Sequence, residues 1–291
     1  MGSDNRISVI GLGSMGTAMV TRLLEQGFQV EIWNRSPKNV DEMFGGKVKQ
    51  VPLEQALQNP FAISFLSNDA AALETFTEAA LAGGAQGSIH LNMSTLSPDA
   101  SRELAARHEK SGLGYLASPI LGRPIAIISG KALSVVAGES ELVEKSAPIL
   151  EKISAKYWHL GKDHAMASLV KLGVNYNLIH ALQAIAESVA LVEAGGVDAN
   201  TFIEIITNTA FTGSAYAGYG PMIANRKYSP AGFSMELGVK DVKLVQAAAS
   251  DLGLNLPVAS VLLDLFQTAN QSPQLHDLDW SAVAELTRKA Q

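Results

Sequence analysis

Three glycines near the N-terminus have the spacing of a loop that binds phosphates. Gly11, Gly13 and Gly16 follow the apolar run at 6–10 and precede a stretch with helical spacing of apolar residues. In a strand–loop–helix unit, the first glycine allows a tight turn, the second lets the backbone approach a pyrophosphate, and the third lets the helix pack closely against the strand. The unpaired N–H groups at the start of the helix then face the phosphates. The pattern predicts a bound dinucleotide, with contacts from Gly11, Leu12, Gly13, Ser14, Met15 and Gly16.

The end of the next predicted strand distinguishes between two dinucleotides. An acidic residue about 20 residues after the glycine loop would bind the ribose hydroxyls of NAD and repel a 2′-phosphate. This chain instead has Asn34, Arg35 and Ser36 at that point. An arginine can offer a planar fork of donors to a phosphate, and an asparagine adds no negative charge. We therefore predict NADP(H) rather than NAD(H). The alternative is that Arg35 is an ordinary surface residue and that Ser36 and Pro37 cap a helix.

A lysine and an asparagine in the middle of the chain could carry out proton transfer. Lys171 and Asn175 are four residues apart, so a helix would place both on one face. The neighbours of the lysine in the sequence, Leu169, Val170 and Leu172, are apolar, and apolar surroundings favour the neutral form of an amine. Such a lysine could donate a proton to a carbonyl oxygen and accept one from an alcohol in the reverse direction, while Asn175 holds the substrate or orients the lysine. From these residues alone, a solvated surface lysine is the commoner interpretation.

The order of the predicted elements places these residues in two domains. Over 1–163, short apolar runs alternate with helical patterns, which is typical of a parallel sheet with helices on both faces. The predicted strands are 6–10, 28–33, 60–67, 87–94, 112–121 and 131–138. After this region strand-like alternation is absent, and a long helix over 164–194 leads into further helical segments. We predict an α/β protein with an N-terminal doubly wound Rossmann domain (1–163), followed by a long interdomain helix and an all-α C-terminal domain (164–291).

Composition excludes several classes of protein. With 47% hydrophobic and 17% charged residues among 291, the chain can bury large cores and should fold. A net charge of −6 argues against a general nucleic-acid binder, because neutralising phosphates needs a basic face. The sequence has no cysteine, no leader pattern and no apolar run of about 18 residues, so we expect a cytoplasmic protein without a membrane span. His159, His164 and His180 are scattered, and we expect no metal site.

Several motifs, taken in order, resemble those of the β-hydroxyacid dehydrogenases. This family includes 3-hydroxyisobutyrate dehydrogenase and the glyoxylate and succinic semialdehyde reductases, and imine reductases are its relatives. The matching stretches are "GLGSMGTAMVTRLLEQG" (11–27), "FLSND" (65–69), "MSTLSP" (93–98), "VKLGVNYN" (170–177) and "MELGVKDVKL" (235–244). The resemblance implies that Lys171 is the catalytic lysine and that the chain forms a homodimer or tetramer. It also implies cofactor contacts from Leu66, Ser67, Asn68, Thr95 and Lys240, with Phe233 as a wall near the nicotinamide.

The chain departs from the family pattern at the substrate motif. The family reads D-A-P-V-S-G-G, whereas this chain reads "ASPILGRP" (117–124), so Leu121 replaces the serine and Arg123 the last glycine. A leucine cannot donate a hydrogen bond, which puts substrates held through that serine, such as simple 3-hydroxy acids, in doubt. Arg123 either pairs with a carboxylate or points to solvent, and Gly122 still allows close backbone approach. Tyr216 and Tyr219 either face the substrate or belong to the core or a dimer interface.

Three functions are compatible with these residues. The resemblance favours an NADPH-dependent reductase of small aldehydes or keto acids, which would act as a β-hydroxyacid dehydrogenase in reverse. An imine reductase is the second possibility, because Leu121 and two tyrosines would suit an apolar cyclic imine, although Lys171 is retained. A non-catalytic NADPH-binding module is the third, and the presence of both Lys171 and Asn175 argues against it.

Overall fold

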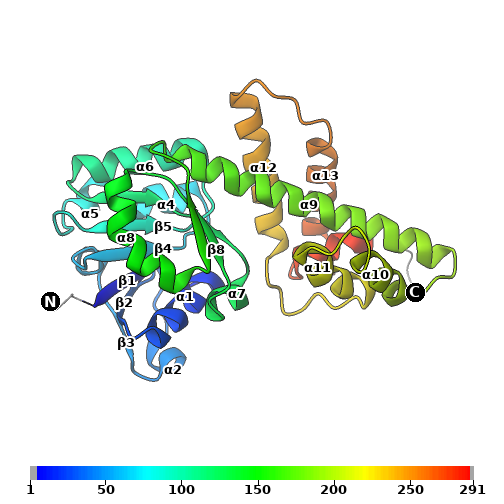
Figure 1. The fold of residues 1–291 in the computed structure, drawn as a ribbon, viewed down its shortest axis with the longest axis horizontal. Coiled ribbons are helices and arrows are strands. Elements are labelled where there is room, and N and C mark those ends of the chain that lie inside the picture. Colours follow the sequence, from blue (N-terminus) through cyan, green and yellow to red (C-terminus); the bar gives the residue numbers. More distant parts are fainter. Residues whose placement is uncertain (1–4, 289–291) are drawn as a thin grey trace. The chain divides into compact units, whose positions relative to one another are not determined.

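The computed structural model describes residues 5–288 and divides into two compact units. The division lies inside one continuous helix, between Lys171 and Leu172 of α9 (Ala165–Ala194) (Figure 1). Near the start of α9, Ala167 is buried in the core of the N-terminal unit. The predicted boundary at 163/164 marks the start of this helix, whereas packing divides the chain within it.

The N-terminal unit is built on a six-stranded parallel sheet. Its strands are β1 (Arg6–Ile10), β2 (Gln29–Trp33), β3 (Val48–Gln50), β4 (Phe61–Ser64), β5 (Ile89–Asn92) and β6 (Gly114–Ala117). Their order is β3-β2-β1-β4-β5-β6, so the chain moves outward from β1 first in one direction and then in the other. This order confirms the doubly wound Rossmann fold, and its direction reverses between β1 and β4, whose carboxyl ends are where such folds bind ligands.

Helices cover both faces of this sheet (Figure 1). They are α1 (Ser14–Glu25), α2 (Val40–Phe44), α3 (Leu53–Ala56), α4 (Asp69–Thr75), α5 (Glu78–Leu81), α6 (Pro98–Lys110), α7 (Pro124–Ile128) and α8 (Ser140–Ile153). Successive side chains along a strand point to opposite faces of the sheet and pack in two different hydrophobic cores. Val9 packs in one core with Met19 of α1, and its neighbour Ile10 packs in another with Leu104 of α6. The strands β1, β4, β5 and β6 are therefore largely buried on both faces, which explains their short and almost continuous apolar runs, whereas the edge strand β3 is mostly exposed.

A second, smaller sheet corrects part of the predicted strand series. The predicted strand 112–121 divides into β6 and β7 (Ile120–Leu121), which are separated by Ser118 and Pro119. A proline has no N–H to donate to a sheet, so the ladder of β6 cannot continue through it. β7 instead pairs with β8 (Leu133–Val136), which also pairs with β9 (Lys156–His159). The predicted strand at 131–138 thus belongs to this three-stranded sheet.

The described part of the C-terminal unit contains helices and no named strand, as predicted. After α9 come α10 (Ala199–Thr207), α11 (Ser214–Ala224), α12 (Met235–Asp251), α13 (Ala259–Gln271) and a final 3-10 helix (Trp280–Leu286). Their core is a single cluster in which Trp280 and Phe266 are almost completely buried. Across the described residues, no helix has the length and apolar character needed to cross a membrane.

Candidate active site

The glycine loop joins β1 to α1 in a conformation that its three glycines make possible. Gly11 has a φ of +96°, and its N–H donates to Trp33 O at 2.8 Å. A Cβ at Gly11 would overlap the carbonyl oxygen of Phe65, and a Cβ at Gly16 would overlap that of Gly11. These two positions therefore require glycine for internal reasons, namely the tight turn and the close approach of α1 to β1.

Gly13 differs, because no contact inside the protein requires a glycine at this position. Its φ of −74° is open to any residue, and a Cβ there would meet no atom within 4 Å. Gly13 is also the N-cap of α1, and no side chain caps this end of the helix. The helix thus begins with uncapped N–H groups beside open space, which suits a pyrophosphate that approaches the backbone closely.

The side chain of Asn34 links this loop to the end of β2. Its Oδ1 accepts a hydrogen bond from Leu12 N at 2.8 Å, and its Nδ2 donates to Ser36 O at 2.7 Å. Arg35 and Ser36 are exposed beside it. The N-cap of α2 is Asn39, so the alternative in which Ser36 and Pro37 cap this helix is wrong. The end of β2 therefore presents an exposed guanidinium and a serine, without a carboxylate at 34–36.

The loops after β4 and β5 are held together by one serine. Ser94 Oγ accepts from Leu66 N at 2.8 Å, and Ser94 N donates to Asn92 Oδ1 at 3.0 Å. Ser67 is exposed, Thr95 is half-buried, and Asn68 Oδ1 accepts from Ala71 N to cap α4. The predicted contacts 66–68 and Thr95 thus lie, with the glycine loop, at the carboxyl ends of neighbouring strands, which is where Rossmann folds bind dinucleotides.

The altered substrate motif lies at the edge of the small sheet. Leu121 pairs with Leu133 across β7 and β8, and its side chain packs against the core cluster that also contacts Leu66. Gly122 has a φ of +156°, and Arg123 is the N-cap of the short helix α7. The side chain at position 121 is therefore apolar and partly buried, so it offers no donor to a substrate.

Lys171 and Asn175 lie one turn apart on α9, as predicted, and both are buried. Lys171 is 8% exposed and Asn175 is 2% exposed. A lysine at this depth is not a solvated surface lysine, so the commoner interpretation of its sequence position is wrong. A buried lysine can donate a proton to a bound molecule or accept one from it, and a neighbouring buried amide can hold the lysine or the molecule by a hydrogen bond.

Sequence reasoning missed a carboxylate that contacts two of the predicted site residues. Asp241 on α12 is completely buried, and its Oδ2 accepts from Asn175 Nδ2 at 2.5 Å. Its Oδ1 lies 3.3 Å from Lys240 Nζ, so one carboxylate contacts both predicted site residues. Because a carboxylate only accepts, the amide must direct its nitrogen to Asp241, which leaves Asn175 Oδ1 available as an acceptor. In the sequence, the neighbouring charges of Lys240 and Lys243 make Asp241 look like part of a solvated helix face.

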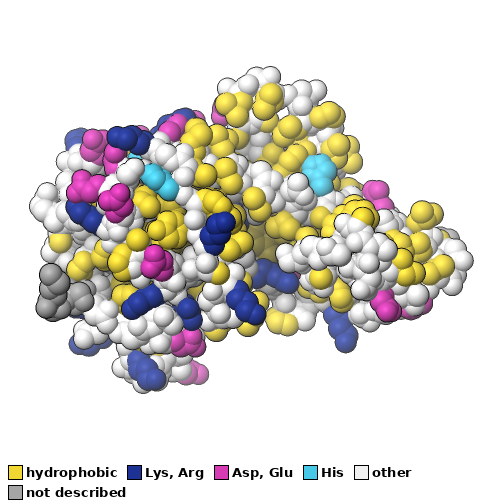
Figure 2. All heavy atoms as spheres, in the orientation of Figure 1, with side chains coloured by type: hydrophobic (Ala, Val, Ile, Leu, Met, Phe, Trp, Pro, Cys, Tyr) yellow, Lys and Arg dark blue, Asp and Glu magenta, His cyan; other side chains and the backbone are white. Residues whose placement is uncertain are grey.

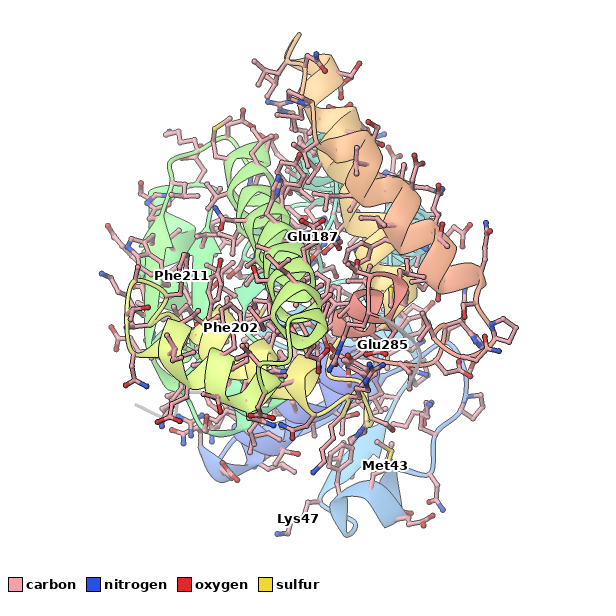
Figure 3. The ribbon with its side chains drawn as sticks, turned by 90° about the vertical axis from the view of Figure 1, so that its right-hand side faces the viewer. Met43, Lys47, Glu187, Phe202, Phe211 and Glu285 are labelled. Atoms are coloured by element: carbon pink, nitrogen blue, oxygen red, sulfur yellow. The ribbon has the colours of Figure 1, made fainter. Side chains whose placement is uncertain are left out.

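The aromatic residues predicted near the substrate have different surroundings. The ring of Phe233 lies 4.3 Å from that of Trp280, and Phe233 N donates to the buried carboxylate of Asp279 at 3.1 Å. Tyr219 is buried in the core of this unit, whereas Tyr216 is half-buried. The ring of Tyr216, on α11, lies 4.8 Å from that of Phe211. Phe211 is in the loop between α10 and α11 (Figure 3). Asp279 is a second buried carboxylate that sequence reasoning missed.

No group of three or more metal-ligating side chains occurs among residues 5–288. The residues brought together are therefore of two kinds. Backbone N–H groups with exposed polar side chains gather at the carboxyl edge of the N-terminal sheet. In the C-terminal unit, Asp241 contacts Asn175 and Lys240, and Lys171 lies one turn before Asn175 on the same helix.

Comparisons with known proteins find relatives along almost the whole chain. Residues 6–161 match a family model described as the NAD binding domain of 6-phosphogluconate dehydrogenase. Residues 165–287 match one described as NAD-binding of NADP-dependent 3-hydroxyisobutyrate dehydrogenase. The chain is 33% identical to an uncharacterized oxidoreductase of Bacillus subtilis, YfjR, covering 96% of this chain and 98% of that protein. It is 29% identical to glyoxylate/succinic semialdehyde reductase 1 of Arabidopsis thaliana, covering 97% and 98%.

Solved structures of two kinds of enzyme share this fold. The 3-hydroxyisobutyrate dehydrogenase of Mycobacterium tuberculosis with L-serine is 26% identical, with a TM-score of 0.86 over 98% of this chain and 99% of that one. An imine reductase of Streptomyces aurantiacus is 25% identical, with a TM-score of 0.65 over 98% and 100%. Both kinds of enzyme named by the predicted resemblance are thus found, and the dehydrogenase has the higher TM-score.

Proposed function

Because the chain belongs to the β-hydroxyacid dehydrogenase family of NAD(P)-dependent oxidoreductases, we propose that it reduces a small aldehyde or keto acid with NADPH. In the reverse direction it would oxidise a β-hydroxyacid. The observation that carries the proposal is the burial of Lys171 one turn from Asn175, whose amide is oriented by Asp241. A module that only binds a dinucleotide has no need of such a set of groups.

The residues of the N-terminal unit fit a dinucleotide. The open space beside Gly13 and the uncapped start of α1 would take the pyrophosphate, and the exposed Arg35 and Ser36 would take a 2′-phosphate. When bound, the nicotinamide supplies or accepts the hydride. The preference for NADP(H) rests on residues 34–36, where an acidic residue would favour NAD(H).

The chemistry proposed for the protein is proton transfer at the substrate oxygen. Lys171 Nζ donates a proton to the carbonyl oxygen during reduction and, as the neutral amine, accepts it back from the alcohol during oxidation. Asn175 Oδ1 accepts a hydrogen bond from Lys171 or from the substrate, because Asp241 keeps the amide nitrogen turned to itself. Lys240, held beside Asp241, would contact the cofactor. Leu121 has no hydroxyl group, so position 121 would not hydrogen-bond to a substrate.

A substrate panel with one variant tests the proton transfer. NADPH oxidation is followed with glyoxylate, succinic semialdehyde, simple aldehydes and a cyclic imine, for the wild type and for Lys171→Ala. We expect turnover of carbonyl compounds by the wild type and a loss of roughly 10²–10⁴-fold in Lys171→Ala. Lys162→Ala is the matched control, because Lys162 is an exposed lysine shortly before α9. Carbonyl turnover that survives in Lys171→Ala would overturn the role of Lys171, and binding without turnover of any compound would favour the module.

An imine reductase is the second candidate, and one observation favours it. The apolar Leu121 replaces a hydrogen-bonding serine, which would suit an apolar imine better than a hydroxyacid. The same panel distinguishes the two, because an imine reductase would turn over only the cyclic imine.

A second experiment tests the choice of cofactor. Dissociation constants for NADPH and NADH are measured by fluorescence titration for the wild type and Arg35→Ala. We expect tighter binding of NADPH by the wild type, and a loss of about 10–100-fold in Arg35→Ala for NADPH alone, because the charge-assisted bonds to a 2′-phosphate disappear. Similar affinities for both cofactors in the wild type, or equal losses in the variant, would overturn the preference.

We also propose that the chain forms a homo-oligomer. Large apolar side chains are strongly exposed, among them Leu191 at 74%, Leu252 at 60% and Leu254 at 58%. Figure 2 shows apolar side chains gathered over the end of the hairpin of α12 and α13, where Leu252 and Leu254 lie. A second copy would cover such residues. Light scattering after size exclusion measures the mass directly, and a monomer at micromolar concentration would overturn the proposal. The expected cytoplasmic location stays a prediction.

A further inference from the structure

We propose that Asn34 is a positioning residue that couples the glycine loop to the 2′-phosphate site, rather than a direct ligand of the cofactor. The inference rests on the proposed use of NADPH and deepens it. In this proposal one side chain holds in position two segments where phosphate groups would bind, namely the start of α1 and the turn at 34–36.

Both functional groups of Asn34 are already used inside the protein. Oδ1 accepts from Leu12 N at 2.8 Å, and Nδ2 donates to Ser36 O at 2.7 Å. The two partners fix the orientation of the amide, because a backbone N–H can only donate and a carbonyl oxygen can only accept. Asn34 is also half-buried, unlike the exposed residues 35–39 that follow it. Its amide therefore faces the protein backbone on two sides.

The first of these bonds continues the pairing between the glycine loop and the end of β2. Gly11 N donates to Trp33 O at 2.8 Å, and the next N–H, that of Leu12, donates to the side chain of Asn34. Two successive N–H groups of the loop are thus directed to β2. The N–H groups that follow, from Gly13 onward, are left for the pyrophosphate at the uncapped start of α1. Loss of Asn34 should loosen the loop for any dinucleotide, whether or not it carries a 2′-phosphate.

The second bond holds the turn that presents Arg35 and Ser36. Residues 35–38 are exposed and bury little apolar surface, so packing does little to hold them. A bond from Lys38 N to Gln50 Oε1, at 3.3 Å, supports the far side of the turn. The Asn34 amide supports the near side, between Arg35 and the strand. Loss of Asn34 should therefore weaken the binding of a 2′-phosphate as well.

The amide also explains why asparagine and aspartate would differ in more than charge. An aspartate at 34 could accept from Leu12 N, but it could not donate to Ser36 O, and its second oxygen would face that carbonyl oxygen. The carbonyl would have to turn away, which would move the Arg35–Ser36 turn. Asparagine thus favours NADPH in two ways, because it adds no negative charge and because it closes the turn.

Binding measurements on three variants test the coupling. Dissociation constants for NADPH and NADH are measured for Asn34→Ala, Asn34→Asp and Arg35→Ala. We expect Asn34→Ala to weaken both cofactors by about tenfold, because a bond that holds the glycine loop is lost, and to weaken NADPH further because the turn opens. Arg35→Ala should weaken NADPH alone. Asn34→Asp should weaken NADPH by about 100-fold or more without improving NADH.

Asn39→Ala provides the matched control. Asn39 is in the same loop and caps α2 through Glu42 N, so its loss disturbs the loop without touching Leu12 or Ser36. This variant should bind both cofactors within about twofold of the wild type. An unchanged affinity of Asn34→Ala for NADH, or a clear gain in NADH affinity in Asn34→Asp, would overturn the positioning role. If the wild type binds both cofactors equally while Asn34→Ala weakens both, the proposed NADPH preference fails and the positioning role stands.

Discussion

The two units of the chain bury different kinds of polar group. In the described part of the N-terminal unit the buried polar side chains are serines, asparagines and histidines, with Lys171 at its edge as the charged exception. In the described part of the C-terminal unit, Asp241, Asp279 and Arg288 are all buried. Backbone N–H groups and surface cations can hold phosphates, whereas a fixed charge can orient an amide beside a proton-transfer residue. The difference matches the roles proposed for the two units.

One buried polar cluster of the N-terminal unit, formed by His90, His108 and Ser64, contains no carboxylate, lysine or arginine. His108 Nδ1 lies 2.7 Å from Leu104 O, which can only accept, so this nitrogen carries the proton and Nε2 accepts. His90 Nδ1, 2.9 Å from His108 Nε2, then donates. His90 Nε2, 2.8 Å from Ser64 Oγ, accepts from the hydroxyl. This arrangement holds for neutral imidazoles, and burial favours the neutral form because it lowers the pKa of both His90 and His108.

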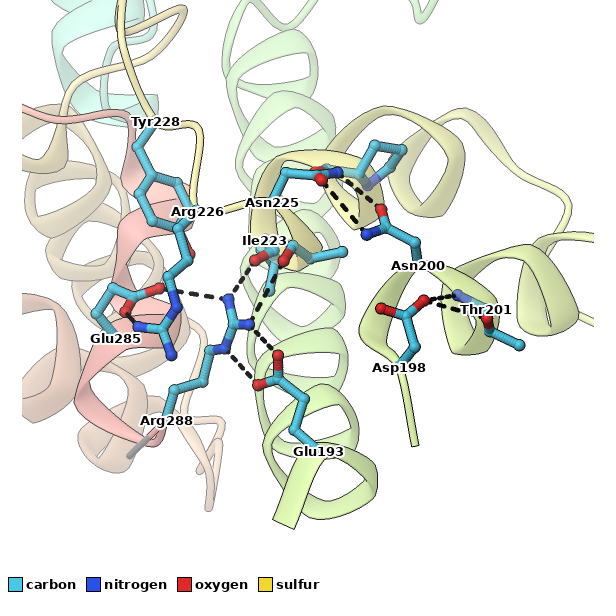
Figure 4. Close-up of polar contacts among 12 residues, drawn as sticks. Glu193, Asp198, Asn200, Thr201, Ile223, Asn225, Arg226, Tyr228, Glu285 and Arg288 are labelled. Carbon is cyan, nitrogen blue, oxygen red and sulfur yellow. Dashed lines mark hydrogen bonds and ion pairs between the residues drawn. The ribbon is translucent and has the colours of Figure 1, made fainter. Parts of the chain in front are cut away.

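The corresponding cluster of the C-terminal unit is ionic (Figure 4). Arg288 forms two bonds to the carboxylate of Glu193, and it also donates to the backbone oxygen of Ile223 near the end of α11. Glu285 accepts from Tyr228 Oη at 2.5 Å and pairs with Arg226. Arg288 thus ties the last described segment of the chain to α9 and α11. The two clusters should respond differently to mutation and to pH.

The largest effect is expected from removing the buried cation. Arg288→Met should lower the free energy of unfolding of the C-terminal unit by about 3–5 kcal/mol, because Glu193 loses its partner and two carbonyl groups lose a donor. Urea unfolding with pulse proteolysis measures this, since the mass of the surviving fragment shows which unit has unfolded. Lys243→Met, at an exposed position of α12, should change stability by less than about 0.5 kcal/mol. Equal effects of the two substitutions would contradict the structural role of Arg288.

Acid should destabilise the N-terminal unit by a comparable amount. Burial lowers the pKa of His108 to about 4 and that of His90 well below its ordinary value, while partial burial lowers that of His164. The unfolded chain binds these protons more readily, so stability is fully present above pH 6.5 and falls as the pH drops toward 4. For His108 the loss approaches about 3 kcal/mol.

The groups that face His90 and His108 do not change the direction of this pH dependence. Tyr115 and Phe76 pack against the rings, and the charge of Arg107 also disfavours a cationic His108. The C-terminal unit buries no histidine among its described residues, so its stability should change less than that of the N-terminal unit between about pH 7.5 and pH 5, above the range in which carboxyl groups titrate. The same urea experiment, repeated between pH 4 and pH 7.5, measures both units. A flat profile for the N-terminal unit would show that its histidines are not neutral when folded.

A smaller effect, on activity rather than stability, is expected from Asp241, one of the buried carboxylates of the C-terminal unit. Asp241→Asn should lower kcat by about 100-fold, because the carboxylate that fixes the amide of Asn175 and contacts Lys240 is replaced by a group that can turn either way. The control is Asp251→Asn, at the exposed end of the same helix. Steady-state kinetics with the best substrate of the panel measures the effect. An unchanged kcat with a raised KM would assign Asp241 to binding instead.

These clusters show what the sequence could and could not predict. The alternation of apolar runs and the three glycines predicted the Rossmann domain, because strand burial and the tight turn depend on residues close together in the chain. The contact of Asn175 with Asp241 joins residues 66 positions apart, and it exists only once α9 and α12 pack together. The pair of His90 and His108 likewise depends on α6 lying on β5. The small sheet is not evident from the sequence, because Pro119 ends the ladder of β6 and the strands β7, β8 and β9 pair across intervening helices.

The smallest effect concerns a pair of uncharged side chains near the start of α9. Here the cost of removing one hydrogen-bond partner can be compared with the cost of removing both. Ser101 Oγ on α6 and Ser168 Oγ on α9 are 2.7 Å apart, and both side chains are buried. Ser168→Ala leaves the hydroxyl of Ser101 without this partner and should lower the stability of the N-terminal unit by about 1–2 kcal/mol, whereas the double alanine variant should lose less than the single one. Urea unfolding of the two single variants and the double variant gives the coupling energy. If the decreases in the free energy of unfolding of the two single variants simply add, the bond contributes nothing to stability. The contrast between the uncharged cluster of one unit and the ionic cluster of the other would then depend on the histidines alone.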